Sequence, residues 1–360
     1  MCMTQRQVAV LTDRDLIREL SHIEPLDAHA MQAARARLDS LTKPQGSLGK
    51  LELLAEKLAG ITRTPTPRPG RKVVLVMAAD HGVALEGVSA YPQQVTAQMV
   101  ANFARGGAAI NVLARHVGAE VIVADVGVCS EIPHDGYVNA KICRGTQNIT
   151  KGAAMTIEQA HSCILTGATL AAYQIDQGAS MVATGEMGIG NTTASTAILC
   201  AITGRPVEEV TGRGTGIDDS ALARKVAAIE QALEVNSPSA SDPLDILVKV
   251  GGLEIGAIAG CILGCAKRRV PVVVDGFIST VAACLASMIA PSSVQYMIGS
   301  HLSCEPGHRV SLEFLGVEPL MSLDMRLGEG TGAVLAMSIA DAAMKILNEM
   351  ATFEEAGVSC

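Results

Sequence analysis

The chain has 360 residues, 49% of them hydrophobic, and a formal net charge of −8 at neutral pH. This hydrophobic content allows a large buried core and excludes a chain that is disordered throughout. The acidic balance disfavours a general nucleic-acid partner, because neutralising phosphates requires a basic surface. With no Trp, 4 Tyr, 4 Phe and 35 Gly, the composition suits an α/β enzyme better than a β-sandwich.

The 10 cysteines are too dilute for a disulfide scaffold, and none forms a CxxC pair. Cys261 and Cys265 lie in an apolar helical stretch, so we expect buried thiols there rather than a metal site. The first twenty residues carry early charges and lack the apolar region of a signal peptide. No apolar run reaches the roughly 18 residues of a membrane span. We therefore expect a reduced, cytoplasmic protein without a membrane partner.

Helical patterns occupy residues 14–60, and a last long helical pattern begins near residue 333. The proline-rich segment 62–72 between the first helices and the rest of the chain is predicted to be a linker. We therefore predict N-terminal helices of a small helical domain over 1–62, a large α/β catalytic domain over 63–332, and a C-terminal helix returning to the small domain over 333–360.

Five short apolar runs alternate with Ala-rich helical stretches in the middle of the chain. Such runs are typical of strands that helices cover on both faces, and the repeated order predicts a doubly wound, mostly parallel, Rossmann-like α/β sheet. In this fold the ligand lies beyond the carboxyl ends of the strands. Any one polar strand end is equally typical of a turn, but five favour a shared cleft. The runs end at Asp80–Gly82, Asp125–Gly127, Glu186, Asp275–Gly276 and Ser300–Ser303.

The segment Arg326–Ala333, RLGEGTGA, places three glycines at alternate positions around Glu329 and leads into an apolar helix. The glycines permit close approach of the backbone to a ligand. A carboxylate in such an apolar setting can have its pKa raised towards neutrality, as a general base requires. A helix N-terminus with Glu329 at its positive end is an equally good interpretation of this segment alone.

Two further glycine-rich segments are candidates for anion binding. Gly185–Ala194 follows a predicted strand and opens a helix, so its backbone N–H groups and Thr hydroxyls suit a phosphate or carboxylate. It lacks the lysine of a P-loop, and a strand-to-helix turn without a ligand is the alternative. Gly212–Asp219 precedes a helix that carries Lys225, and it is either an anion-binding loop or a surface loop capped by Asp218. A mononucleotide-sized phosphate ligand is favoured.

Histidine and serine patterns exclude two classes of site. No HxxxH or HxH pair occurs, which disfavours zinc, and no GxSxG occurs, which excludes the hydrolase elbow. His81 and His301 follow predicted strands and could enter the cleft. A nicotinamide-dependent dehydrogenase is also disfavoured, because AADHG replaces GxGxxG after the first predicted strand.

Four segments occur in one order along the chain: Lys43–Gly49 (KPQGSLG), Ala79–Val83 (ADHGV), Gly185–Thr193 (GEMGIGNTT) and Arg326–Gly332 (RLGEGTG). Together they closely resemble the nicotinate-nucleotide:dimethylbenzimidazole phosphoribosyltransferase family, from about residue 25 to about residue 350. The resemblance implies a homodimeric transferase of cobalamin biosynthesis, with a large parallel α/β domain and a small helical domain from both chain ends. We expect no cofactor and no metal.

The reaction that the resemblance implies moves 5-phosphoribosyl from nicotinate mononucleotide to 5,6-dimethylbenzimidazole. Nicotinate and α-ribazole 5′-phosphate are released, with inversion at C1′. Glu329 matches the catalytic base of the family, and this chain has Tyr91 and Met99 where some members have Ser and Gln. The implied nucleotide-binding residues are Glu186, Gly188, Gly190, Asn191, Thr192, Gly214, Lys225 and Ser303, and the implied aromatic-base pocket contains Asp80, Tyr91, Gln98, Met99 and Leu327.

One alternative of a different class stays open at this point. A non-catalytic nucleotide-binding regulatory module could use the same glycine-rich loops, with Glu329 serving only to cap a helix. Release of nicotinate from nicotinate mononucleotide in the presence of dimethylbenzimidazole discriminates the enzyme from the module.

Overall fold

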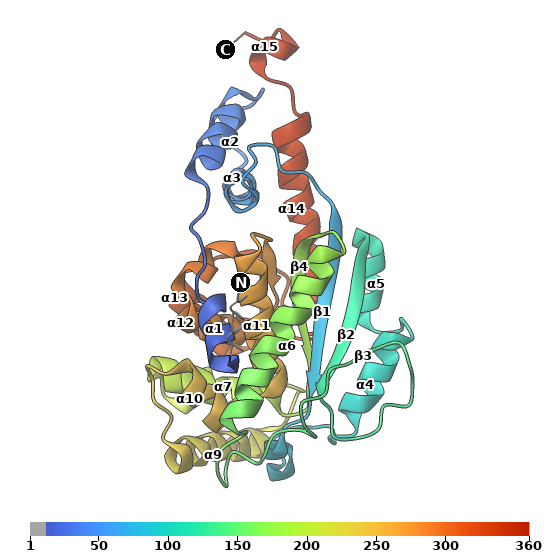
Figure 1. Cartoon of the computed structure of the whole chain (residues 1–360), viewed down its shortest axis with the longest axis vertical. Helices are drawn as coiled ribbons and strands as arrows, with labels where there is room; N and C mark the ends of the chain where they lie inside the picture. Colours follow the sequence, from blue (N-terminus) through green and yellow to red (C-terminus); the bar gives the residue numbers. More distant parts are fainter. Residues whose placement is uncertain (1–11, 360) are drawn as a thin grey trace, which may run out of the picture.

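A computed structural model describes residues 12–359 of the chain (Figure 1). The amino-terminal eleven residues, which hold Cys2 and part of the segment that argues against a signal peptide, and Cys360 lie outside the described residues. Within residues 12–359, seven strands form one sheet in the order β3-β2-β1-β4-β5-β6-β7, and all neighbours in it are parallel. The prediction of a doubly wound parallel α/β fold is confirmed. The strands are β1 (Arg71–Ala79), β2 (Ala119–Gly127), β3 (Val138–Asn139), β4 (Ala179–Met187), β5 (Val272–Val274), β6 (Met297–Leu302) and β7 (Pro319–Ser322).

Five of these strands, β1, β2, β4, β5 and β6, coincide with the five predicted apolar runs. The edge strands β3 and β7 were not predicted, because they are short and lack a buried apolar pattern. β1 pairs with both β2 and β4, so the strand order reverses direction between β1 and β4. Ligands of such sheets bind in the crevice that opens at this reversal.

Helices cover both faces of the sheet. They are α1 (Asp13–Leu20), α2 (Ala28–Ser40), α3 (Lys50–Thr62), α4 (Val95–Ala104), α5 (Ala109–Val117), α6 (Ile157–Asp176), α7 (Asn191–Thr203), α8 (Val207–Val210), α9 (Asp219–Asn236), α10 (Pro243–Val250), α11 (Leu253–Lys267), α12 (Phe277–Ile289), α13 (Pro306–Leu315), α14 (Thr331–Glu349) and α15 (Phe353–Ala356), with 3₁₀ turns η1 (Gly82–Glu86) and η2 (Pro291–Tyr296). None of the described helices is long and apolar enough to cross a membrane.

Alternate residues of β1 enter two separate cores, as the two-residue period of a strand requires. Val73, Leu75 and Met77 pack with α6, α7, α11 and α12, whereas Val74 and Val76 pack with α3, α4, α5 and α14. Each face of the central strand is therefore buried, which explains why its sequence is a continuous apolar run.

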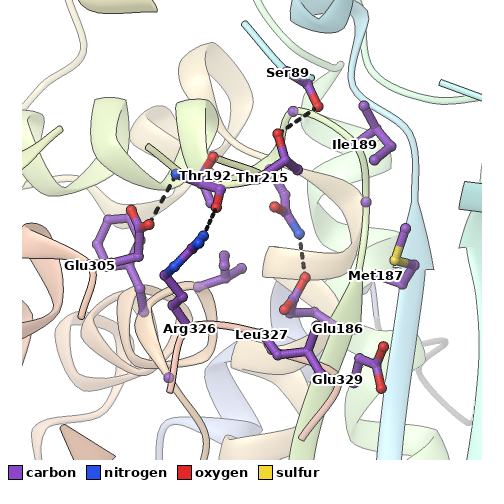
Figure 2. A pocket seen from close by; sticks show the side chains of 18 of the residues that line it. Ser89, Glu186, Met187, Ile189, Thr192, Thr215, Glu305, Arg326, Leu327 and Glu329 are labelled. Atoms are coloured by element: carbon purple, nitrogen blue, oxygen red, sulfur yellow. Dashed lines mark hydrogen bonds between the residues drawn. The ribbon is translucent and has the colours of Figure 1, made fainter. Parts of the chain in front are cut away.

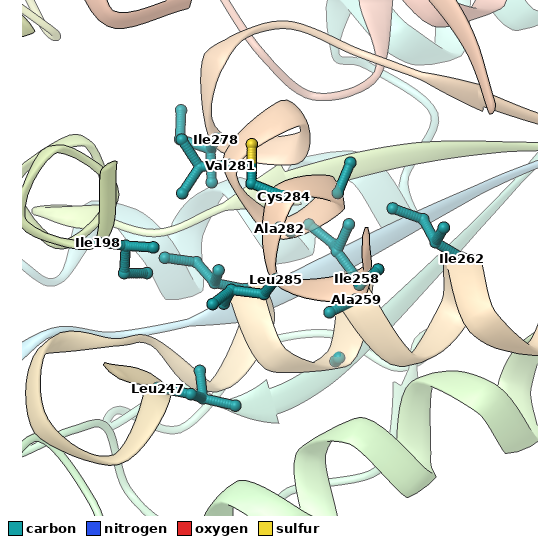
Figure 3. Close-up of a cluster of buried hydrophobic side chains, with 14 of the residues drawn as sticks. Ile198, Leu247, Ile258, Ala259, Ile262, Ile278, Val281, Ala282, Cys284 and Leu285 are labelled. Carbon is teal, nitrogen blue, oxygen red and sulfur yellow. The ribbon is translucent and has the colours of Figure 1, made fainter. Parts of the chain in front are cut away.

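Small residues allow the close helix packing that replaces aromatic side chains in this protein. Gly167 of α6 lies directly against the backbone of Ala257, and Gly260 of α11 lies against the backbone of Ile164, so neither position has room for a Cβ atom. Ile258, Ala259 and Ile262 of α11 contribute to a cluster with side chains of α7, α10 and α12 (Figure 3). Cys261 and Cys265 are fully buried free thiols on α11, as predicted.

Helices α2 and α3 from the first part of the chain lie beside α14 from its last part, beyond one end of the sheet (Figure 1). α2 packs on α3, and α3 packs on α14. Arg37 of α2 donates hydrogen bonds to the carbonyls of Leu347 and Met350 at the end of α14. By contrast, α1 packs against α6 and α11 beside the sheet. The helices of the predicted segment 1–62 thus differ in their packing partners, and the division into two domains stays a prediction.

Candidate active site

A cavity of about 550 Å³ lies beyond the carboxyl ends of β1, β4, β5 and β6, at the reversal of strand order. All three glycine-rich segments that the sequence singles out contribute to its lining (Figure 2). Strand-end residues of β5 and β6 and the loop before α4 complete the wall. The cavity thus lies in the crevice where ligands of such sheets bind.

Most of the predicted site residues line this cavity. Glu329 does so, and with it Glu186, Gly188, Gly190, Asn191, Thr192, Gly214, Ser303, Tyr91, Met99 and Leu327. The structure places Lys225, Asp80 and Gln98 outside the lining, each for a different local reason.

Lys225 of α9 is fully buried behind the cavity wall. Its Nζ donates hydrogen bonds to Thr192 Oγ1 at 2.8 Å and to the Gly212 carbonyl at 3.0 Å. Burial lowers the pKa of Lys225 to about 8, and the nearby charge of Glu305 opposes that shift. In this geometry Lys225 reaches the cavity through Thr192.

Asp80 and Gln98 are turned away from the cavity. Asp80 Oδ2 accepts a hydrogen bond from the Cys129 N–H at 2.8 Å, so the carboxylate joins the ends of β1 and β2. Gln98 lies on the exposed side of α4, whereas Val95 and Met99, one helical turn apart, line the cavity.

Of the two histidines at strand ends, His301 lines the cavity and His81 does not. His81 is 1% exposed, and its Nε2 lies 2.7 Å from Glu254 Oε1 beneath the turn at Gly188. Burial alone would lower the pKa of His81, but the charge and hydrogen bond of Glu254 raise it. His301 at the end of β6 lines the cavity, beside Asp275.

Glu329 occupies an unusual backbone conformation. Its φ is +63°, between Gly328 at +86° and Gly330 at +93°, and this left-handed region is costly for a residue that has a side chain. Its carbonyl packs so closely on β4 that a Cβ atom on Gly185 would lie 2.5 Å from it. Glycines at positions 185, 328 and 330 are therefore needed for the Glu329 turn to adopt this conformation and to pack on β4.

The Glu329 carboxylate is held at the cavity wall. Its Oε2 accepts a hydrogen bond of 3.2 Å from the Ile110 N–H at the start of α5, and the residue is 5% exposed. Burial raises the pKa of Glu329 above its usual value, the hydrogen bond from Ile110 opposes this, and the charge of Asp275 adds to it. A raised pKa makes the ionised form a stronger base.

Glu186 is the second carboxylate of the cavity. It lies at the end of β4, accepts a hydrogen bond from the Asn191 amide, and packs directly against Gly328. Burial, followed by the charges of Glu254 and Asp275, raises the pKa of Glu186 to about 8. Glu186 is therefore mostly protonated at neutral pH.

The two ends of the cavity differ in chemistry (Figure 2). One end carries hydroxyl and backbone groups around Thr192, Gly214 and Ser303, with Arg326 Nη1 donating to the Gly214 carbonyl at 3.0 Å. The apolar part of the lining comes from four segments, and Met187 lies on the same side of the cavity as Glu329 in Figure 2. Its side chains, which we call the apolar slot, are those of Val88, Tyr91, Val95, Met99, Met187, Ile189 and Leu327.

Sequence reasoning did not name several residues of the lining as site residues. Asp275 and His301 carried a signal, since both end predicted strands, but no role was assigned to them. Glu305 carried none: its Oε1 accepts from the Gly214 N–H at 3.0 Å, a contact between segments 91 residues apart. Arg326 belongs to a segment that was singled out only for Glu329 and its glycines.

Comparisons with known proteins agree with this geometry. A family model described as phosphoribosyltransferase matches residues 23–358. Nicotinate-nucleotide–dimethylbenzimidazole phosphoribosyltransferase of Chloroflexus aggregans is 59% identical over 345 residues, covering 96% of this chain and 98% of the relative. The enzyme of that name from Desulforamulus reducens is 56% identical over 346 residues, covering 96% of this chain and 99% of the relative.

The fold is shared with a solved structure of the same kind. The crystal structure of nicotinate-nucleotide–dimethylbenzimidazole phosphoribosyltransferase from Thermus thermophilus matches with a TM-score of 0.88 and 48% identity. The match covers 93% of this chain and all of the other. The resemblance seen in the four sequence segments is thereby confirmed. This chain belongs to the nicotinate-nucleotide–dimethylbenzimidazole phosphoribosyltransferase family.

Proposed function

We propose that this chain transfers the 5-phosphoribosyl group of nicotinate mononucleotide to 5,6-dimethylbenzimidazole. The observation that carries the proposal is the position of Glu329, a buried carboxylate in a cavity that has both an apolar slot and a hydrogen-bonding end. The apolar slot suits a flat heterocycle, and the hydroxyl and backbone groups suit a phosphate. Family membership supports the same two substrates.

The chemistry needs one base and no acid. The C1′–N bond of nicotinate mononucleotide breaks with its electron pair going to the pyridinium nitrogen, which leaves as the neutral ring of nicotinate. One benzimidazole nitrogen attacks C1′ from the opposite face and forms the new bond. The proton on the other nitrogen passes to the Glu329 carboxylate. Attack from the opposite face inverts C1′ and gives α-ribazole 5′-phosphate.

Two effects account for the acceleration in this proposal. Holding both reactants in one cavity can lower the barrier by roughly 7–11 kcal/mol. A positioned general base adds about 10²–10⁴-fold. Protonation of Glu186 removes one negative charge from the neighbourhood of Glu329 at neutral pH.

The phosphate is assigned to the end of the cavity at Thr192, Gly214 and Ser303. Thr192 stands in the first turn of α7, where helix N–H groups favour an anion. Lys225 supplies positive charge behind Thr192, and Arg326 supplies it at the cavity wall.

The same family membership supports a proposal for the assembly. We infer a homodimer that works in the cytoplasm, with a small helical domain built from α2, α3 and the end of α14. Light scattering on the purified protein tests the dimer, and a mass of one chain would contradict it.

A turnover assay tests the function. The protein is incubated with nicotinate mononucleotide and 5,6-dimethylbenzimidazole, and release of nicotinate and formation of α-ribazole 5′-phosphate are followed by chromatography. Both products are expected in equal amounts. Binding of the nucleotide without release of nicotinate would favour the regulatory module. Competition among several benzimidazoles, purines and phenols in the same assay identifies the preferred acceptor.

A further inference from the structure

We propose that Asp275 is the positioning residue of Glu329, holding its left-handed turn from a neighbouring strand. The inference rests on the proposed role of Glu329 as the base. Asp275 follows β5 directly and is 2% exposed. It lies 55 residues before Gly330, the glycine of the turn that it contacts.

Two hydrogen bonds join Asp275 to that turn. Its Oδ2 accepts from the Gly330 N–H at 3.1 Å, and its Oδ1 accepts from the Ala333 N–H at 2.9 Å. The Gly330 N–H belongs to the peptide group whose carbonyl is that of Glu329. This bond therefore orients the peptide plane directly after Glu329, and with it the direction in which the Glu329 side chain leaves the backbone.

The turn needs an external hold because α14 has no capping side chain of its own. The first N–H groups of a helix have no partner within the helix. In α6 and α9 the preceding Thr156 and Asp218 accept one of these hydrogen bonds. The corresponding residue of α14 is Gly330, which has no side chain to offer. Asp275, which directly follows β5, accepts these hydrogen bonds instead.

The turn before α14 is closely packed on its neighbours. Gly330 packs on Val74, where a Cβ atom would lie 2.8 Å from Cγ1, and Gly332 packs directly on the His301 ring. His301 Nδ1 in turn lies 3.8 Å from Asp275 Oδ1. The turn before α14 is thus packed between β1, β4 and β6, with Asp275 against it. Loss of the two Asp275 hydrogen bonds is therefore expected to displace this packed turn.

Both oxygens of Asp275 are committed to backbone N–H groups. Asp275 therefore acts through Glu329 and is not a second base for the azole. This distinction makes the inference testable, since a residue that acts through another loses its effect when the other is absent.

The experiment is a double-mutant cycle of Asp275→Asn and Glu329→Gln. Asn keeps the shape of Asp but places an amide N–H group against one of the two backbone N–H donors. We expect kcat of Asp275→Asn to fall on the order of 10²-fold, as displacement of a positioned group does. KM for nicotinate mononucleotide is expected to stay nearly unchanged, because the nucleotide end is untouched. In the Glu329→Gln background the same change is expected to leave kcat unaltered.

A matched control is Asp242→Asn, in which a capping Asp accepts hydrogen bonds from the Leu244 and Asp245 N–H groups of α10, away from the cavity. It is expected to lower thermal stability without changing kcat. An unchanged kcat in Asp275→Asn, or an equal loss of kcat in both backgrounds, overturns the inference. Wild-type turnover in Glu329→Gln alone overturns the proposed base, which is a separate result.

Folding of the variants is checked by circular dichroism and thermal melting. Asp275→Ser, whose hydroxyl accepts from one of the two N–H groups, replaces Asp275→Asn in the cycle if the latter does not fold. Failure of both variants to fold would overturn the inference, because Asp275 would then be a requirement of the fold and not of the base position.

Discussion

The starts of α7 and α14 are alike in sequence and opposite in use. Both helices follow a glycine-rich segment that contains a Glu, and both have a left-handed glycine at the cap, Gly190 at +97° and Gly330 at +93°. The N–H groups of α14 are taken by a carboxylate of the protein, Asp275. The first residues of α7, Asn191 and Thr192, instead face the cavity. The Asn191 and Thr193 N–H groups donate to the carbonyls of Gly188 and Gly190, but no side chain caps α7, and we assign this helix start to the anionic substrate.

The glutamates of the two turns differ in the same sense. Glu186 lies well before its glycine cap, within β4, where Asn191 and Gly328 enclose it. Glu329 directly precedes its glycine cap and takes the left-handed conformation itself. The two carboxylates thus reach the same cavity from different backbone positions, Glu186 from the end of β4 and Glu329 from the left-handed turn before α14.

The sharpest test of this difference is Glu329→Gln. We expect the fold to be preserved and kcat to fall about 10²–10⁴-fold, because the amide cannot accept the azole proton. Steady-state kinetics and a thermal melt measure the two effects. The exposed Glu313→Gln on α13 is the control, with no change in kcat expected. Comparable kcat values for the two variants would contradict the assignment of the base.

The helix start that faces the nucleotide is tested by Lys225→Met, which keeps most of the side-chain volume and removes the charge. We expect KM for nicotinate mononucleotide to rise about 10- to 100-fold, the usual effect of a hydrogen bond to a charged group, with a smaller change in kcat. Lys345→Ala, on the exposed side of α14, is the control. An unchanged KM in Lys225→Met would remove Lys225 from the phosphate site.

The two glycine caps are compared by Gly330→Ala and Gly190→Ala. Both place a side chain in the left-handed region, which costs on the order of 1–3 kcal/mol. A Cβ atom on Gly330 would also lie 2.8 Å from Val74 Cγ1, whereas one on Gly190 would lie 3.3 Å from its nearest neighbour, His81 Cβ. Urea denaturation is expected to show the larger loss for Gly330→Ala. The reverse order would mean that the turn before α14 is the more adaptable one.

The smallest effect on turnover is expected for Glu186→Gln, since this carboxyl group is already protonated at neutral pH. Its pKa is raised from 4.5 to about 8 in the folded protein. The unfolded chain therefore releases this proton first, and wild-type stability declines as pH rises from about 4.5 to about 8. Thermal melts across this window are expected to show Glu186→Gln gaining stability relative to wild type as pH rises. A constant difference would contradict the raised pKa.

The central strands and the place of the cavity were predictable because they depend on local patterns. β1 is buried on both faces, so its apolar run is continuous, and polar residues at strand ends meet at one edge of a parallel sheet. The edge strand β3 has two residues and no such pattern, so nothing in the sequence identifies it.

The orientation of single side chains was not predictable in the same way. The segment before and within α4 was expected to line the base pocket, but the rotation of the helix directs Val95 and Met99 inward and Gln98 outward. Asp80 turns to a backbone N–H group of the neighbouring strand connection. The hold of Asp275 on Gly330 depends on two segments 55 residues apart meeting across the sheet edge. Such contacts follow from the assembled fold and not from residue spacing.

α14 both begins at the Glu329 turn and fills the core on one face of the sheet. Its residues Ala333, Val334, Met337, Ala340 and Leu347 are all fully buried there. Deleting α14 is therefore expected to unfold the protein as well as to abolish its activity, because the same helix fills the core and follows the Glu329 turn. Only exchange of individual side chains can separate the two, so an inactive but well-folded descendant of this enzyme would be expected to keep α14 and to have lost its glutamate.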